Sequence, residues 1–466
     1  MTTAAPSPAP SSVPTARLSS PTVLLGVGLA LEIFSGNWRY LHIPLGGDRI
    51  LLVVGLVVLA LGGVRVVSDR RLQFRPLHLV LLATGTYATV SALAAQTFSS
   101  SDARFALLDR LGLIPFLMFA LAPLVFGTAR QRNFLLAVLV ATGAYLGVIA
   151  FLEGVGLTSL AIPSYIRNPN LGLHFGRARG PFLESAADGL SLYICGVAAA
   201  VGFKTWSTPR ARALCVAVMG LSALGVVFTL TRAVWLAAVI GTLAAMVVTP
   251  RGRRLLVPTL VAAAIVVVAV VVLVPGLESK ASNRFDDQLP IWDRYNTNSA
   301  AVRMVEARPL FGFGWQTFST TGPDYMRLAS NYPLTGAGNE VHNVFLSHAA
   351  ELGIVGSLLW VCALLGAVGG AIVRRGPPEL LPWRLGLVAI FVAFLVVASL
   401  GPLSYPFPNL LLWTWAGVTA AEHFLRPRAS DDSRVAESSS RPRLAHDAAD
   451  EDSRVASRGA HGAVPR

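Results

Sequence analysis

The chain has 466 residues, of which 54% are hydrophobic and only 14% are charged, and its mean hydropathy is +0.60. Soluble globular proteins carry about 25% charged residues, so the composition excludes an ordinary soluble domain and indicates an integral membrane protein. The net charge of +13 does not indicate a nucleic-acid partner, because the basic residues cluster in short loops between apolar runs, where they set membrane topology. Cys195, Cys215 and Cys362 all lie in apolar runs without a CxxC or Cys/His pairing, so we expect neither a disulfide nor structural zinc.

The N-terminal segment, residues 1–20, is rich in Pro, Ser and Ala, and we predict that it is disordered. The apolar run Pro21–Phe34 that follows is typical of a retained first helix rather than of a cleavable signal peptide. Further apolar runs of about 18–25 residues recur up to residue 425, which is the length of a membrane-spanning helix. We predict an all-α, polytopic membrane domain over residues 21–425 with about twelve transmembrane helices. The predicted spans are 21–37, 49–65, 76–97, 105–127, 132–153, 184–204, 211–230, 232–249, 254–275, 343–372, 382–400 and 405–424.

The loops after every second predicted span carry the basic residues. They include Arg70 and Arg71, Arg130 and Arg132, Arg210 and Arg212, Arg251 to Arg254, and Arg374 and Arg375. Positively charged loops lie on the cytoplasmic side, so both termini are predicted to be cytoplasmic. The opposite loops are then extracytoplasmic, and two of them are large, 154–183 and 276–342. The tail, 426–466, is polar and mixed in charge, and we predict that it is disordered and cytoplasmic.

The second large loop contains a short stretch with helical spacing of apolar residues, Ser299–Leu310, and it ends in the segment HNVFLSHAAELGIVG at 342–356. His342 precedes an apolar helix at the predicted membrane surface. An imidazole titrates near neutral pH, so His342 is a candidate general base, with an interfacial histidine that caps the helix as the alternative. Asn343 either orients the His342 ring or caps the helix, and His348 is expected to pack in the core.

Glu351 lies within the same predicted span. Carboxylates inside a membrane are costly, so a partner or a function is expected for it. Glu351 is nine residues beyond His342, about 13 Å deeper along a helix and on the opposite face. We therefore expect Glu351 to pair with an arginine of another helix and to support the site rather than contact His342.

Among the arginines on the predicted outer side, which run against the usual charge bias, four are singled out: Arg177 and Arg179 in GRARGPF, Arg232 in FTLTRAVW, and Arg294 in the large loop. Guanidinium groups bind phosphate oxygens in pairs and stay charged, so these residues are candidates to bind a diphosphate. The alternative is that they snorkel or form salt bridges within the loops. For Arg294, the available partners are Asp286, Asp287, Asp293 and Glu306.

The string RPLFGFGWQTF at 308–318 contains Gly312 and Gly314, which allow close approach of the backbone to a ligand. The spacing is not that of a dinucleotide-binding turn, and the sequence contains no Walker A, HExxH or GxSxG motif. The pair Asp286-Asp287 is expected to be solvated rather than to bind a metal. We therefore predict neither a metal site nor a cofactor.

Taken together, the strings RARGPF, FTLTRAVWL, PLFGFG fifteen residues after Arg294, and HNVFLSHAAELGIVG resemble the O-antigen ligase/polymerase family, in the family's order and over residues 170–365. The sequence departs from the family's Asn-Pro-Asn after the first string, where it has Leu-Glu-Ser, and has Thr231 where a serine is usual. The resemblance implies a GT-C-like helical fold with its site at the outer face. It also implies metal-independent glycosyl transfer, with His342 as the base and with Arg177, Arg232 and Arg294 holding the diphosphate.

The expected partners are a glycan donor on undecaprenyl diphosphate, a lipid A core or other glycan acceptor, and the membrane lipids. An acceptor in lipid A core would make the protein a ligase, and a second lipid-linked glycan would make it a polymerase; the sequence leaves both open. The localisation predicted is the inner (plasma) membrane. A transporter or flippase is the alternative from another class, with Glu32, Asp109, Asp188 and Glu351 as ionisable residues inside spans. A structural membrane scaffold is a third reading.

Overall fold

The computed structural model describes residues 18–43, 46–62, 70–274, 276, 278–279, 282, 288–327, 340–402 and 405–427. Most of the two predicted disordered ends, 1–20 and 426–466, and the pair Asp286-Asp287 lie outside these residues. Within them, the secondary structure is helical apart from one pair of three-residue strands, β1 (Arg70–Leu72) and β2 (Leu425–Pro427). The all-α prediction is confirmed for this part of the chain.

Eight helical segments in the described part are long and apolar enough to cross a membrane, and each coincides with a predicted span to within a few residues. They are α3 (Pro76–Ala94), the segment Ser101–Val125 formed by α4 (Ser101–Phe105), η5 (Ala106–Leu111) and α5 (Leu113–Val125), α6 (Ala129–Gly154), α7 (Ser185–Thr205), α8 (Pro209–Phe228), α10 (Pro250–Leu273), the segment Val344–Val373 formed by α14 (Val344–Leu364), η9 (Leu365–Gly369) and α15 (Gly370–Val373), and the segment Pro378–Leu400 formed by η10 (Pro378–Leu380) and α16 (Leu381–Leu400).

The other four predicted spans contain shorter helices. They are α1 (Ser20–Leu31), α2 (Gly47–Gly62), α9 (Arg232–Val247) and α17 (Pro406–Thr419), with 12, 16, 16 and 14 residues. A helix needs about 20 residues to cross the hydrocarbon core, so the count of twelve stays a prediction. Short elements complete the described part: η1 (Glu32–Phe34), η2 (Trp38–Leu41), η4 (Thr97–Ser99), η6 (Thr158–Leu160), η7 (Ser164–Arg167), η8 (Gly180–Phe182) and α18 (Ala421–Phe424).

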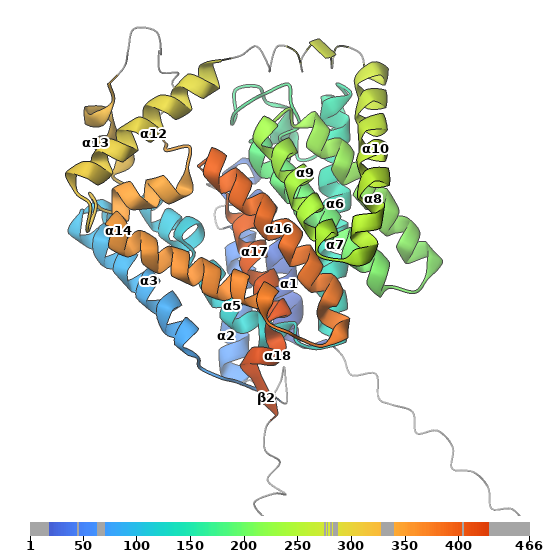
Figure 1. The fold of residues 1–466 in the computed structure, drawn as a ribbon, viewed down its shortest axis with the longest axis horizontal. Helices are drawn as coiled ribbons and strands as arrows, with labels where there is room; N and C mark the ends of the chain where they lie inside the picture. The colour runs from blue at the N-terminus through green and yellow to red at the C-terminus, as the bar shows by residue number, and fades with distance from the viewer. Residues whose placement is uncertain are drawn as a thin grey trace, which may run out of the picture. The chain divides into compact units, whose positions relative to one another are not determined.

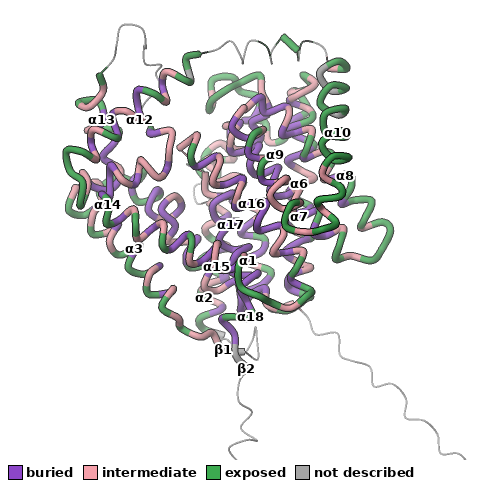
Figure 2. The backbone as a smooth tube through the Cα atoms, in the orientation of Figure 1, coloured by how far each residue is buried: buried purple, intermediate pink, exposed green. Residues whose placement is uncertain are grey.

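The helices pack in pairs around a buried centre. α7 packs on α6 and α8, α16 packs on α9 and α7, and α17 packs on α5. Figure 1 shows α16 and α17 in the middle of the bundle, and Figure 2 shows that α17 is buried while α10 is exposed along its length. The core holds large aromatic side chains, and the indole nitrogen of Trp415 donates a 2.8 Å hydrogen bond to the carbonyl of Trp383. The exposed apolar face of α10 is the surface expected of a helix that contacts lipid.

The large loop before α14 folds into α12 (Leu289–Ala307) and α13 (Phe318–Tyr325), which pack on each other and on α14. The helix predicted at 299–310 is therefore present, but it begins earlier in the sequence. Its buried face carries Ala300, Ala301 and Met304, which pack against Phe318 and Val341. In Figure 1, α12 and α13 lie at the end of the molecule opposite to β2.

The turn at 308–314 interlocks with a kink in α14. Gly353 has φ 68° and ψ −177°, which interrupts the helix and exposes backbone groups on both sides of the kink. The turn satisfies these groups: Gly314 N donates to the Glu351 carbonyl at 2.8 Å, and Ile354 N donates to the Pro309 carbonyl at 2.8 Å. A Cβ on Gly312 would lie 2.5 Å from the Glu351 carbonyl oxygen. Of the two glycines predicted to approach a ligand, Gly312 allows the turn to approach α14, and Gly314 allows it to approach the end of α3, where a Cβ would lie 2.2 Å from the Ala95 Cβ.

We predict that Gly353→Ala destabilises the protein by at least about 2 kcal/mol. The new Cβ would lie 2.2 Å from the Leu310 carbonyl oxygen, and an alanine at this φ is strained in addition. The thermal unfolding of the detergent-purified protein measures the loss. Gly220→Ala in α8 is the matched control because no atom lies within 4 Å of its Cβ position. Equal stability of the two variants would show that the interlock contributes nothing.

Candidate functional site

Glu351 holds the turn of the large loop. Its side chain is 2% exposed, and its two oxygens accept hydrogen bonds from the backbone N–H groups of Gln316 at 3.0 Å and Phe318 at 3.1 Å. Phe318 is the first residue of α13, so the carboxylate satisfies donors at a helix start, where negative charge is favourable. The sequence-based expectation of an arginine pair is corrected to this pair of amides. Arg110 of η5 also acts on Glu351 electrostatically.

The residues around the start of α14 have separate roles. The Asn343 side chain accepts a hydrogen bond from Leu346 N at 3.0 Å and thereby caps α14, one of the two roles predicted for it. Its amide nitrogen also donates to the Ser399 carbonyl of α16 at 3.4 Å. His348 is 4% exposed and packs edge-on against Trp360, with ring centroids 4.6 Å apart. Its predicted packing role agrees with this placement.

His342 is the last residue of the large loop, and two residues of α12, Asp293 and Arg294, act on it electrostatically. Its ring donates a hydrogen bond to the backbone carbonyl of Glu340, and its Nδ1 is buried with no hydrogen-bond partner in the described part of the chain. Burial lowers the pKa of His342 below its usual value, and the nearby Arg294 lowers it further, while Asp293 and Glu340 oppose the shift. The imidazole is therefore neutral at neutral pH. A neutral ring with one nitrogen held by a carbonyl presents the lone pair of the other nitrogen as a proton acceptor.

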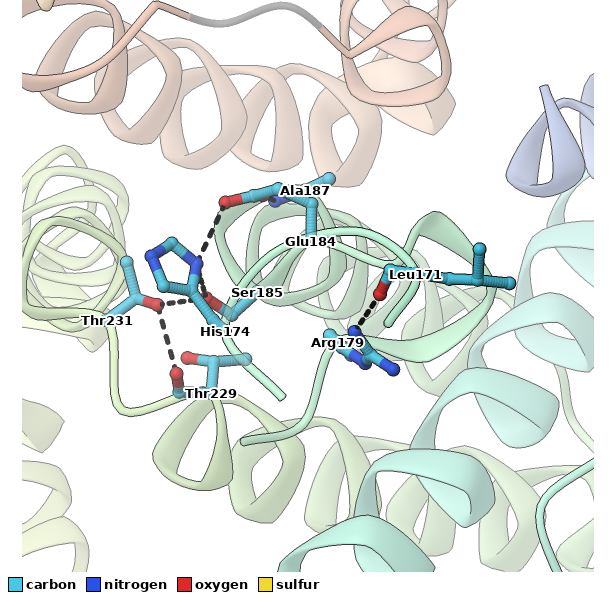
Figure 3. Close-up of polar contacts among 8 residues, drawn as sticks. All are labelled: Leu171, His174, Arg179, Glu184, Ser185, Ala187, Thr229 and Thr231. Atoms are coloured by element: carbon cyan, nitrogen blue, oxygen red, sulfur yellow. Dashed lines mark hydrogen bonds and ion pairs between the residues drawn. The ribbon is translucent and has the colours of Figure 1, made fainter. Parts of the chain in front are cut away.

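Arg179 holds the first outer loop together. Its side chain is 1% exposed, and its guanidinium donates hydrogen bonds to three backbone carbonyls, those of Leu171, Ile166 and Asn168. The bond to Leu171 is drawn in Figure 3. The predicted diphosphate-binding role does not fit this geometry, because the guanidinium is buried and donates its hydrogen bonds to carbonyls of the loop. Arg177, two residues earlier, is only partly buried.

A polar network joins this loop to the start of α9, and Figure 3 shows its members facing one another. His174 Nδ1 lies 3.3 Å from the Ser185 hydroxyl and 3.6 Å from a carboxylate oxygen of Glu184. Ser185 in turn accepts a 3.1 Å hydrogen bond from the Thr231 hydroxyl. Thr231 directly precedes Arg232, the first residue of α9, and Arg177 N donates to the His174 carbonyl at 3.3 Å. The network therefore connects the backbone of Arg177 to Thr231, the residue before Arg232.

Tyr405 links this network to the His342 region. The Tyr405 hydroxyl forms a hydrogen bond with the Glu184 side chain, and Glu340 and Arg110 both act on it electrostatically. Arg110 and Glu340 form an ion pair with an N–O distance of 2.5 Å. These two residues also line a polar cavity of about 70 Å³ together with Gln316, Phe318, Ser319, Val341, Ser347, Glu351 and Pro402.

Tyr405, at the start of α17, thus interacts both with Glu184, which directly follows the first large loop, and with Glu340 of the second. The sequence motifs did not identify five members of this region, His174, Glu184, Tyr405, Arg110 and Glu340. One sequence feature did draw attention to Glu184, because Leu-Glu-Ser stands where the family has Asn-Pro-Asn. Arg110 had no signal, because it lies in an apolar span far from every motif. In the described part of the chain, no group of three or more His, Cys, Asp or Glu side chains is arranged to hold a metal ion.

Residues 217–361 match the O-antigen ligase family. The matched segment runs from α8 to α14 and contains Arg232, Arg294, His342 and Glu351. It confirms the resemblance seen in the motifs and supports a membrane glycosyltransferase function of the O-antigen ligase/polymerase kind. No curated protein matches the chain. With its multiple apolar helices, the chain is a multi-pass membrane protein.

We predict that Arg177→Met and Arg179→Met, in the first outer loop, differ in their effects on stability and on substrate binding. Arg179→Met leaves three carbonyls without their donor and removes a buried group, so it should cost on the order of 2–3 kcal/mol of stability. Arg177→Met should leave the thermal unfolding midpoint nearly unchanged and weaken binding of a lipid-linked glycan. The reverse pattern, with Arg179→Met stable and impaired only in binding, would restore Arg179 to the binding residues.

Proposed function

We propose that this protein transfers a glycan from undecaprenyl diphosphate to a hydroxyl acceptor at the outer face of the inner membrane. Two observations support the proposal. The segment 217–361 matches the O-antigen ligase family. The observation that carries it is the convergence of the two large loops on Tyr405, because this groups His342 with the segments that bear Arg177 and Arg232.

In the proposed reaction, His342 is the general base and touches the acceptor. Its hydrogen bond to the Glu340 carbonyl fixes the tautomer, so the unpartnered Nδ1 accepts the proton of the acceptor hydroxyl. The hydroxyl oxygen attacks the anomeric carbon with inversion. The bond from that carbon to the diphosphate oxygen breaks, and the oxygen keeps the electron pair. General bases of this kind typically contribute about 10²–10⁴-fold to a rate.

The leaving undecaprenyl diphosphate gains negative charge, which Arg177, Arg232 and Arg294 stabilise in this proposal. Guanidinium groups placed before the reaction cost no rearrangement when charge develops, and the loss of one such donor typically costs about 10²–10³-fold in rate. Because these cations oppose the charge of the leaving group, we propose a transfer that needs no metal ion. Arg179 is left out of this set because its guanidinium is bound to the loop.

The proposed orientation places α12, α13 and the site outside and both termini in the cytoplasm. The strands β1 and β2 lie side by side, away from α12 and α13 (Figure 2). β1 follows α2 and β2 follows α18, and both are flanked by arginines, which favour the cytoplasmic side. We also propose the twelve-span, GT-C-like arrangement, with α1, α2, α9 and α17 as the shorter crossings.

The acceptor decides between the two enzymes of this family. With lipid A core as acceptor the protein is a ligase, which is the proposal's first form. With a second lipid-linked O-antigen, capsule or exopolysaccharide glycan as acceptor it is a polymerase, and the same residues serve both reactions. The transporter alternative draws on two acids buried within the bundle, Glu32 and Asp188. The side-chain oxygens of Asp188 have no hydrogen-bond partner in the described part of the chain.

We predict that His342→Ala lowers kcat about 10²–10⁴-fold, because it removes the proton acceptor. The assay follows transfer of glycan from a polyprenyl-diphosphate donor by the purified protein, and donor binding is measured separately. His348→Ala changes a buried ring and serves as a control for destabilisation without loss of the base. Retained donor binding with lost transfer supports the role. Full activity of His342→Ala would eliminate His342 as the base.

The pH dependence follows from the lowered pKa of His342. The neutral ring is the active form, so kcat/KM should stay constant from neutral pH down to below 6.5 and fall only as the pH drops through the lowered pKa. Asp293→Asn removes a charge that raises this pKa, so it should move the fall to still lower pH. An unchanged profile in Asp293→Asn, or a fall that begins above pH 7, would contradict the assignment.

A further inference from the structure

Arg110 occupies a rigid turn inside the bundle. It lies in η5, a π-helical turn between α4 and α5, and π-turns are frequent at functional sites. Two other helices hold the backbone of this turn. The Asn409 amide of α17 donates to the Asp109 carbonyl at 2.6 Å, and the Trp360 indole of α14 donates to the Leu111 carbonyl at 3.1 Å. The side chain of Arg110 therefore starts from a fixed point.

The guanidinium of Arg110 interacts with several residues near His342. It forms the 2.5 Å ion pair with Glu340, which lies 230 residues away in the sequence. It also acts electrostatically on Glu351, Tyr405 and His348. The side chain of Arg110 is 21% exposed and that of Glu340 is 46% exposed. Ion pairs with this much exposure contribute little to stability, so a gain in stability does not account for this pair.

Glu340 connects Arg110 to the proposed base in two ways. Its backbone carbonyl accepts the hydrogen bond of the His342 ring, which determines the nitrogen that carries the proton. Its carboxylate is one of the charges that act on His342, together with Arg294 and Asp293 of α12. The position of Glu340 therefore sets both the orientation and the charge environment of the ring, and Arg110 holds Glu340 in that position.

We propose that Arg110 is a positioning residue that acts through Glu340 to hold His342 in its base-competent tautomer and orientation. The inference rests on the proposed function, because it assigns a role to Arg110 only if His342 is the base. Outer residues that orient a catalytic or ligand-binding histidine typically change activity about 10–100-fold when they are removed. The competing role is direct contact of Arg110 with the diphosphate of the donor.

The test compares Arg110→Met, Arg110→Lys, Glu340→Gln and His342→Ala in the purified full-length protein, with a polyprenyl-diphosphate glycan as donor. For Arg110→Met we expect kcat to fall about 10–100-fold, with the donor KM changed less than about threefold. The acid limb of the kcat profile should move to higher pH, because the Glu340 carboxylate is no longer neutralised beside His342. Arg110→Lys keeps the charge and should recover part of kcat. Arg104→Gln changes an exposed arginine of the preceding helix and is the control.

The decisive comparison is the double variant Arg110→Met with His342→Ala. If Arg110 acts through His342, the double variant is no slower than His342→Ala alone. An additive loss, or a raised donor KM with an unmoved pH profile, would overturn the positioning role. If His342→Ala itself retains full activity, the proposed function loses its base, and that failure is seen without reference to Arg110. Arg110→Lys keeps the test informative if Arg110→Met does not fold.

Discussion

The buried carboxylate of Glu351 is the interaction on which the site depends. It accepts hydrogen bonds from the backbone N–H groups at the start of α13. The kink at Gly353, which lies in α14 like Glu351, forms hydrogen bonds with the turn that precedes α13. These contacts attach the whole α12–α13 segment to α14. Arg294 lies on α12 and His342 lies just before α14, so their proximity follows from this attachment. Inside a membrane protein, backbone groups freed by a kink need partners from the protein itself, and the turn supplies them.

The second constraint is Tyr405 at the start of α17. It interacts with Glu184, which directly follows the first outer loop, and with Glu340 of the second. Arg179 holds the first loop together through its bonds to carbonyls of that loop, and Glu351 of α14 binds the second loop. The candidate site is therefore a junction of two loops whose described parts are each held by hydrogen bonds of their own. Preorganised cations and a fixed base at such a junction are the features that accelerate glycosyl transfer without a covalent intermediate.

Hydropathy and charge predicted most of the helices, because membrane-spanning segments are defined by length and composition alone. Motif spacing predicted the placement of His342 next to an apolar helix, and the cap formed by Asn343 was one of the two roles predicted for that residue. The roles that depend on the path of the loops were beyond the sequence. Arg177 and Arg179 are two residues apart, and only the fold of residues 166–171 decides that Arg179 binds their carbonyls. The ion pair of Arg110 and Glu340 joins a span to a distant loop, and no local pattern indicates it.

The most direct measurement is the chemical balance of a single turnover. Purified protein in liposomes would be given a lipid-linked glycan and an acceptor, and the products would be identified by mass spectrometry. The account predicts one glycosylated acceptor and one free undecaprenyl diphosphate for each donor consumed, with neither product formed by the His342→Ala variant. An intact donor that reaches the opposite leaflet, with no glycosylated acceptor, would contradict the account and identify the protein as a transporter.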